Sequence, residues 1–300
     1  SGVDKAWLAE DLERALAALV VPDCSFDGCS HCGVCGPELG HNVVIPTPPV
    51  PAALPRRAPP SERVARLRFG FAKVGSLALI SHLDTLRMLE RALRRSGLPV
   101  SFSGGFHPMP RLQLALPLPL GVEGEAEWLD LEFCAPVVAE QARSALAAVL
   151  PPDFSLLSVA SVPLAAESLS QQLRAAVWRF TLVPEVEPGG PLPSQAHWQQ
   201  AFDALIAAEA LVWRDTDKKG RARERDCRPA LQDLRILDAA ASDGCGGVAD
   251  GSVVLHLEAG IDPLGRSLRP EQVAFWLERS LQRRLRVQGV VREALRLRTC

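Results

Sequence analysis

The sequence lacks long apolar runs and has little net charge. None of its 300 residues falls in a stretch of roughly 18 uninterrupted apolar side chains, the length that a membrane-spanning helix requires, so we expect no integral membrane protein and no membrane partner. The formal net charge is −2, so any attraction to nucleic acid must come from local patches. Only four of the 33 cationic residues are lysine, and arginine suits phosphate forks and aromatic stacking better than lysine does.

Several common catalytic motifs are also missing. The chain has no Ser/His/Asp order of a hydrolase triad, no phosphate-binding P-loop and no dinucleotide fingerprint. It has no basic-then-apolar signal segment and begins Ser1-Gly2-Val3 rather than with Met, so we expect a piece of a longer protein or a tag remnant. Nothing suggests export, and we expect a cytoplasmic location.

A cluster of cysteines near the N-terminus is the strongest motif that is present. Cys24, Cys29, Cys32 and Cys35 have the spacing C-x4-C-x2-C-x2-C. Four thiolates so close together favour one metal centre over disulfides, and the spacing leaves a [4Fe–4S] cluster and a zinc ion both open. The x4-then-x2 spacing differs from the x3-then-x2 spacing of the radical SAM signature, so we do not expect the catalytic cluster of such an enzyme.

Composition divides the chain into four segments. Residues 1–45 contain a helical periodicity followed by the cysteines, which predicts a helix and a cysteine loop in one module. A proline-rich stretch over 46–62 predicts an extended linker. Residues 63–165 and 174–298 each show strands and helices in the order βαβ then βαβ, which is the ferredoxin-like split motif. We therefore predict an α+β protein with tandem ferredoxin-like (split βαβ) domains after a small Cys-rich metal-binding module. Within the second domain, the pattern over 221–237 predicts a basic hairpin followed by a helix.

Arginine-rich segments are candidates for contact with nucleic acid. A predicted helix from Ser81 to Arg95 has arginines on one stripe and leucines on the other, and a loop over 103–111 combines glycine, phenylalanine, histidine and arginine. Flexible glycines allow close approach of the backbone, and His, Phe and Arg together suit a phosphate and a stacked base. The segment 214–228 mixes seven cationic with four acidic side chains and could contact a phosphate backbone. The candidate RNA-binding residues are Arg87, Arg91, Arg94, Arg95, His107, Arg111, Lys218, Lys219 and Arg221.

Each of these segments also has a purely structural interpretation. The arginine stripe is then a solvated face of a core helix, the histidine of the loop caps a turn, and the basic segment is an exposed loop with mixed charges.

Several motifs resemble the radical SAM-linked domain family of unknown function. In the first half they are Ser81-His82-Leu83-Asp84, Glu90-Arg91-Ala92-Leu93-Arg94-Arg95, Gly97-Leu98-Pro99, the 103–111 loop and Pro117-Leu118-Pro119-Leu120-Gly121. In the second half they are Lys218-Lys219-Gly220 with Asp226 and Arg228. Residues 2–36 resemble the extreme C-terminal tail of cobalamin-binding radical SAM proteins. The resemblance covers nearly the whole chain and implies the C-terminal part of a fusion whose catalytic barrel is missing here. Members of the family sit near genes of ribosomal proteins and of an RNase G/E-type enzyme, which implies an RNA substrate.

One main hypothesis and two alternatives follow. The main hypothesis is an accessory module that recognises structured RNA, a tRNA or an rRNA, for modification by a radical SAM catalytic domain, fused or separate. In the first alternative the chain is itself an RNA-processing endoribonuclease of the tandem ferredoxin-like type, with His82 or His107 as general base. In the second it is a protein-interaction scaffold.

Overall fold

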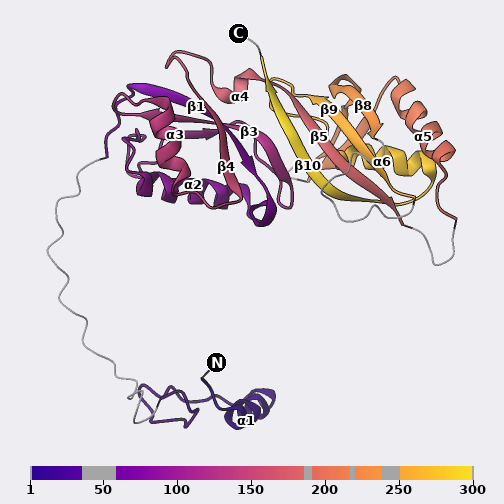
Figure 1. Cartoon of the computed structure of the whole chain (residues 1–300). Helices are drawn as coiled ribbons and strands as arrows, with labels where there is room; N and C mark the ends of the chain where they lie inside the picture. The colour runs from indigo at the N-terminus through magenta and orange to yellow at the C-terminus, as the bar shows by residue number, and fades with distance from the viewer. Residues whose placement is uncertain (1, 36–58, 186–190, 217–219, 238–250, 299–300) are drawn as a thin grey trace. The chain divides into compact units, whose positions relative to one another are not determined.

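The chain forms two compact units in the computed structural model, Ser1–Ala58 and Pro59–Cys300 (Figure 1). The structure describes residues 2–35, 59–185, 191–216, 220–237 and 251–298. Lys218, Lys219 and most of the predicted proline-rich linker lie outside these ranges. None of the helices in the described ranges combines the length and apolar character needed to cross a bilayer.

The first unit contains one helix followed by the cysteine loop. Helix α1 (Lys5–Leu16) begins after Asp4, whose side chain accepts hydrogen bonds from the backbone N–H groups of Ala6 at 2.7 Å and Trp7 at 3.4 Å. This is the N-cap arrangement that satisfies the free amides of a first helical turn. The helix ends at Leu16, shortly before the chain enters the left-handed region at Ala18 (φ 55°).

The second unit is built on one mixed sheet of eight strands, counted over the described residues. Their order is β4-β1-β3-β10-β5-β9-β8, and β2 pairs with β3 beside this path. All recorded pairings are antiparallel except that of β3 with β10, which is parallel. The strands are β1 (Ala65–Lys73), β2 (Leu112–Leu114), β3 (Glu123–Phe133), β4 (Phe154–Ser161), β5 (Leu173–Pro184), β8 (Leu231–Leu237), β9 (Val253–Gly260) and β10 (Leu285–Leu297).

Two halves of this unit repeat one arrangement. In the first half, the four strands in chain order lie side by side as fourth, first, third and second, which are β4, β1, β3 and β2. The second half shows the same order with β10, β5, β9 and β8. The mixed α and β composition and the large sheet agree with the predicted α+β class. The two halves also share the sheet, because β3 of the first half pairs with β10 of the second.

Each half has its own apolar core between the sheet and two helices (Figure 1). In the first half, α2 (His82–Ser96) and α3 (Ala139–Ala147) cover side chains of β1, β3 and β4. In the second half, α5 (Gln195–Ala207) and α6 (Pro270–Leu281) cover β5, β9 and β10. The remaining elements are η1 (Gly75–Leu79), α4 (Leu169–Gln172), β6 (Val212–Thr216), β7 (Ala222–Asp226) and η2 (Arg228–Ala230).

The helix predicted at the end of 221–237 is wrong, because strand β8 occupies this part of the chain. Leu231 and Leu234 are both buried, and their spacing of three mimics one face of a helix. The register against β9 shifts between Leu231 and Asp233. Such an irregularity adds a residue to one strand, so side chains three positions apart reach the same core.

Candidate functional site

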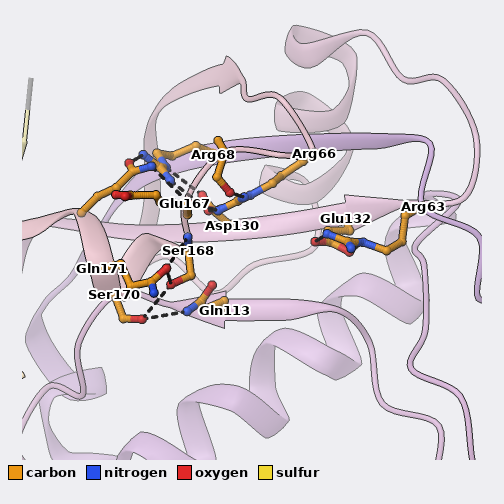
Figure 2. Close-up of polar contacts among 12 residues, drawn as sticks. Arg63, Arg66, Arg68, Gln113, Asp130, Glu132, Glu167, Ser168, Ser170 and Gln171 are labelled. Atoms are coloured by element: carbon orange, nitrogen blue, oxygen red, sulfur yellow. Dashed lines mark hydrogen bonds and ion pairs between the residues drawn. The ribbon is translucent and has the colours of Figure 1, made fainter. Parts of the chain in front are cut away.

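Charged side chains gather on the face of β1 and β3 that is turned away from the first core. Leu67 of β1 is buried in that core, whereas its neighbours Arg66 and Arg68 lie on the opposite face, as the two-residue period of a strand requires. They pair in register with Glu132 and Asp130 of β3. We call these side chains, together with Arg63, Arg111 and Gln113, the polar sheet face (Figure 2).

Asp130 holds both arginines of β1. Its carboxylate accepts a hydrogen bond from Arg68 Nε at 2.8 Å and from Arg66 Nε at 3.0 Å. Arg66 and Asp130 are buried, with 6% and 3% of their surfaces exposed. Buried charges persist only when they are paired and hydrogen-bonded, so this contact fixes the position of the guanidinium groups.

Glu132 is the second carboxylate of the polar sheet face. It accepts hydrogen bonds from Arg63 Nε at 2.6 Å and Arg63 Nη2 at 2.7 Å (Figure 2). Arg111 Nε lies 3.9 Å from the same carboxylate. Together with the contacts of Asp130, four arginines therefore share two carboxylates, and the surface has an excess of positive charge.

Residues in and before α4 accept hydrogen bonds from the guanidinium groups of Arg66 and Arg68. Arg66 Nη1 donates to the carbonyl oxygen of Ala166 at 3.0 Å, and Arg68 Nη1 donates to Gln172 Oε1 at 2.6 Å. Gln113 Nε2 donates to Ser170 Oγ at 3.3 Å (Figure 2). These contacts hold the polar groups in place before any ligand arrives.

A hollow of about 280 Å³ opens on this face. It is lined by both ends of the 103–111 loop, together with polar groups of the sheet. The lining side chains include Arg66, Ser103, Met109, Arg111, Gln113, Asp130 and Glu132. The predicted residue Arg111 therefore contributes directly to the hollow.

The 103–111 loop forms the rim. Two hydrogen bonds close it, from Ser103 N–H to the carbonyl oxygen of Met109 at 2.8 Å and from Met109 N–H to Ser103 Oγ at 3.0 Å. Gly105 has φ 101°, a conformation that L side chains rarely adopt. At the tip, Phe106 is 101% exposed and the predicted residue His107 is also exposed. The ring of Phe106 is therefore accessible to a stacking partner.

Helix α2 presents its arginines to solvent. Ser81 Oγ accepts a hydrogen bond from Asp84 N–H at 3.2 Å and caps the start of the helix, and Gly97 with φ 69° follows its end. The predicted residues Arg87, Arg91, Arg94 and Arg95 are all exposed.

Two of these arginines have contacts within the protein. Arg87 pairs with Asp84 at 3.1 Å, and Arg95 donates to the carbonyl oxygen of Val149 at 2.8 Å. Arg91 and Arg94 have no ion pair or hydrogen bond to a side chain in the described part of the chain. No hydrogen bond or ion pair between described residues joins the α2 arginines to the rim loop.

His82 lies beside a buried cluster of charges. Arg292 donates to Glu127 from Nε at 2.6 Å and from Nη2 at 2.7 Å, and buried Lys73 donates to the carbonyl oxygen of Ile80 at 3.2 Å. Burial lowers the pKa of His82, and the positive charges of Lys73 and Arg292 lower it further. The neutral imidazole is thus favoured near pH 7, as a general base requires, but no hydrogen bond between described residues links His82 to His107.

The cysteine loop packs against the start of α1. Asp4 N–H donates to the carbonyl oxygen of Cys32 at 2.8 Å, and Trp7 Nε1 donates to that of Ser30 at 2.8 Å. His31 N–H lies 3.3 Å from Cys29 Sγ, an amide-to-sulfur hydrogen bond of the kind that stabilises metal-bound thiolates.

The donor set of this loop fits a thiolate-bound metal. Cys24, Cys29, Cys32 and Cys35 are free thiols, which are the ligands that zinc and iron–sulfur clusters take. Over the described ranges, no three His, Cys, Asp or Glu side chains already converge as a metal site. A metal centre at these four cysteines therefore stays a prediction.

The predicted basic hairpin exists as β6 and β7, with Arg221 exposed just before β7. Its charges partly cancel, since Arg214 Nε lies 2.7 Å from Glu224. The predicted residues of this segment are not brought to the polar sheet face by any contact between described residues.

Sequence reasoning missed Arg63, Arg66, Arg68 and Gln113. A signal was available for two of them, because charged and apolar residues alternate in Arg66-Leu67-Arg68 and in Asp130-Leu131-Glu132. Alternation of this kind predicts a strand with one core face and one polar face. Arg63 and Gln113 are placed only by tertiary contacts.

The match to a family model establishes which family the protein belongs to. Residues 66–263 match the model of a family described as an uncharacterized protein conserved in bacteria (DUF2344). The chain belongs to this family. The matched range begins at Arg66 and excludes the cysteine loop, and nothing in it links the DUF2344 chain to radical SAM or cobalamin-binding proteins.

No curated protein matches this DUF2344 chain. Among solved structures, it is similar to a crystal structure of a Cbf5-Nop10-Gar1 complex, with a TM-score of 0.41 and 9% identity over 76% of this chain and 49% of that chain. An archaeal box H/ACA sRNP Nop10-Cbf5 complex gives a TM-score of 0.36 and 8% identity over 74% and 46%. An unknown protein from Galdieria sulphuraria gives 0.23 and 12% over 75% and 97%.

The DUF2344 chain spans about half the length of the first two of these structures. TM-scores this low establish neither a shared fold nor a shared ligand.

Proposed function

We propose that the second unit recognises RNA through the rim loop and the polar sheet face, and presents that RNA to a radical SAM catalytic domain, fused or separate. One observation carries the proposal. The fully exposed residue Phe106 stands beside exposed His107 on the rim of a hollow that Arg66 and Arg111 line.

The chemistry of this site suits an unstacked nucleotide of a structured RNA. An exposed aromatic ring offers a stacking platform, and stacking of one base contributes about 1–3 kcal/mol. The hydroxyl of Ser103 and the amide of Gln113 line the hollow and have donor and acceptor groups that match base edges. Arg111 is the guanidinium of the rim loop and lies within reach of a phosphate on either side of that base.

Positive charge outside the hollow adds an attraction that does not depend on sequence. Arg91 and Arg94 lie on the exposed side of a helix that is fixed to the core through Leu89 and Leu93. Each cation that neutralises a phosphate releases counterions, so the affinity falls as salt is raised. The α2 arginines thus bind phosphates, whereas the rim loop selects the nucleotide.

The finer architecture belongs to the same proposal. We assign a ferredoxin-like split βαβ arrangement to each half, and its support is the repeated strand order fourth, first, third, second.

In the first unit, the four cysteines hold one metal centre, a [4Fe–4S] cluster or zinc, which orders the junction to the catalytic domain. The amide-to-sulfur contact at Cys29 supports this assignment.

Ultraviolet crosslinking of the full chain to total RNA, followed by sequencing, tests the proposal. We expect enrichment of one region of a tRNA or rRNA, and loss of that enrichment in the variants Phe106→Ala and Arg111→Gln. Leu157→Ala is a matched control, because Leu157 is also an exposed apolar residue but lies on β4. A flat profile in the unmodified chain would contradict RNA recognition and favour a protein-interaction scaffold. Cleavage of the RNA that is lost in His107→Ala would favour the endoribonuclease.

A further inference from the structure

A second hollow lies in the other half of the sheet. Its volume is about 420 Å³, and it opens where β5 and β8 begin and β9 and β10 end. The strand registers bring these ends together, since Ala175 pairs with Gly260, Leu231 with Ala259, and Leu297 with Leu173. A cavity of this size is in the range that holds a small-molecule ligand. We call it the arginine hollow.

Four arginines and two aspartates line the arginine hollow: Arg174, Arg225, Arg266, Arg298, Asp226 and Asp262. Asp262 is already paired. Its carboxylate accepts from Arg266 Nε at 2.7 Å and from the backbone N–H groups of Leu264 at 2.9 Å and Arg266 at 2.8 Å. These two opposite charges therefore cancel within the lining.

The second aspartate is occupied by the backbone. Asp226 Oδ1 accepts from Leu211 N–H at 2.8 Å and from Arg228 N–H at 2.9 Å, and these two backbone hydrogen bonds lower the pKa of Asp226. Arg174 and Arg298 have no carboxylate partner among the described residues. Among the residues that the structure describes, the lining consequently keeps an excess of positive charge.

Arg225 contributes a further guanidinium group to the lining. Its Nε is buried and has no hydrogen-bond partner among the described residues. A buried donor without an acceptor costs about 1–3 kcal/mol, so native structures retain few of them. Burial raises the pKa of the adjacent Cys227 thiol, although Arg225 opposes this shift, so the sulfur is uncharged near pH 7 and gives Arg225 no anionic partner.

We propose that the arginine hollow binds a phosphate group, carried either by a free nucleotide or by the end of an RNA chain. Several guanidinium forks around one cavity match the oxygens of a phosphate and form charge-assisted hydrogen bonds with it. A bound phosphate neutralises Arg174 and Arg298 and gives the guanidinium group of Arg225 a charged partner. This proposal does not rest on RNA binding at the rim loop, which lies in the other half of the sheet.

Isothermal titration of the full chain with AMP, adenosine and inorganic pyrophosphate tests the proposal. We expect AMP or pyrophosphate to bind and adenosine not to bind. Arg225→Gln and Arg174→Gln should each weaken this binding about 10-fold or more, the loss that follows when one charged hydrogen bond is removed. The matched control is Arg235→Gln on β8, which removes the same charge outside the hollow and should leave the affinity unchanged.

Two further measurements complete the test. The first compares 5′-phosphorylated RNA with 5′-hydroxyl RNA of the same sequence. If only the phosphorylated RNA binds, and Arg174→Gln weakens this binding, the RNA end is the source of the phosphate. If AMP binds in an Arg174-dependent manner and neither RNA does, the source is a free nucleotide. The second measurement, circular dichroism, checks that the variants fold. Arg174 is exposed, so Arg174→Gln can still be tested if Arg225→Gln unfolds. Equal affinity for AMP and adenosine, no binding of any phosphate, or equal effects of Arg174→Gln and Arg235→Gln would overturn the proposal. Phe106→Ala should leave phosphate binding unchanged.

Discussion

The buried pair of Arg292 and Glu127 joins the two halves of the sheet. β3 and β10 pair in register at Glu123–Val291 and Gly124–Arg292, next to this ion pair. Besides its two hydrogen bonds to Glu127, Arg292 donates to the carbonyl oxygens of Leu116 at 3.1 Å and Pro117 at 3.2 Å. The side chains of Arg292 and Glu127 are only 1% and 3% exposed.

Arg292→Met should strongly destabilise the second unit. The substitution leaves a buried carboxylate without its partner and two carbonyl oxygens without a donor, and breaking a buried ion pair in this way costs about 3–5 kcal/mol. Lys73 remains close enough to interact with the charge of Glu127, so we expect a loss near the lower end, about 3 kcal/mol. Arg296→Met on the same strand is the control. Arg296 is 57% exposed in its pair with Glu258, and its loss should cost less than about 1 kcal/mol.

Guanidinium unfolding of the full chain, followed by tryptophan fluorescence, measures both free energies. Trp178 is a suitable reporter because the guanidinium carbon of Arg292 lies 5.4 Å from the centre of its ring. The double variant Glu127→Gln with Arg292→Met should be more stable than Arg292→Met alone, because no unpaired carboxylate remains. Equal losses for Arg292→Met and Arg296→Met would refute the assigned role of the pair.

Three further predictions concern protonation, charge and metal. Because the pKa of His82 is lowered in the folded chain, the unfolded chain binds more protons below about pH 6.5. The free energy of unfolding should therefore fall as the pH drops from 7 to 5, and His82→Asn should reduce the slope of this free energy against pH. Identical slopes for the two proteins would contradict the shift. Arg91→Gln with Arg94→Gln should reduce the slope of log affinity for RNA against log salt by about one per residue, and an unchanged slope would exclude phosphate contact by α2. Cys32→Ser should lower the zinc or iron content of anaerobically purified protein, measured by mass spectrometry of the metals, whereas Cys134→Ser should not; equal contents would argue against a metal centre at the loop.

Local signals account for the features that the sequence predicted well. Helix α2 is bounded by Ser81 and Gly97, whose cap conformations depend on neighbouring residues alone. The rim loop is equally local, because its glycines and prolines cannot continue a regular element. The predicted arginines of α2 are exposed, and Arg111 lines the hollow as part of that loop.

Long-range contacts account for what the sequence did not predict. The joining of the two halves depends on Arg292 reaching Glu127, and the polar sheet face depends on the register between β1 and β3. Strand β8 was mistaken for a helix because an irregularity in its pairing with β9 displaces the alternation of buried residues. The arginine hollow likewise forms only where the ends of four strands meet.

Mapping the amino acids that crosslink to RNA tests the central claim most directly. The full chain is irradiated in the presence of RNA from its own host and is then digested. Mass spectrometry identifies the peptide that carries the nucleotide adduct. The account predicts that the adduct lies on the peptide containing Phe106 and His107. RNA crosslinked only elsewhere in the chain, or no adduct at all, would contradict recognition of RNA by the rim loop.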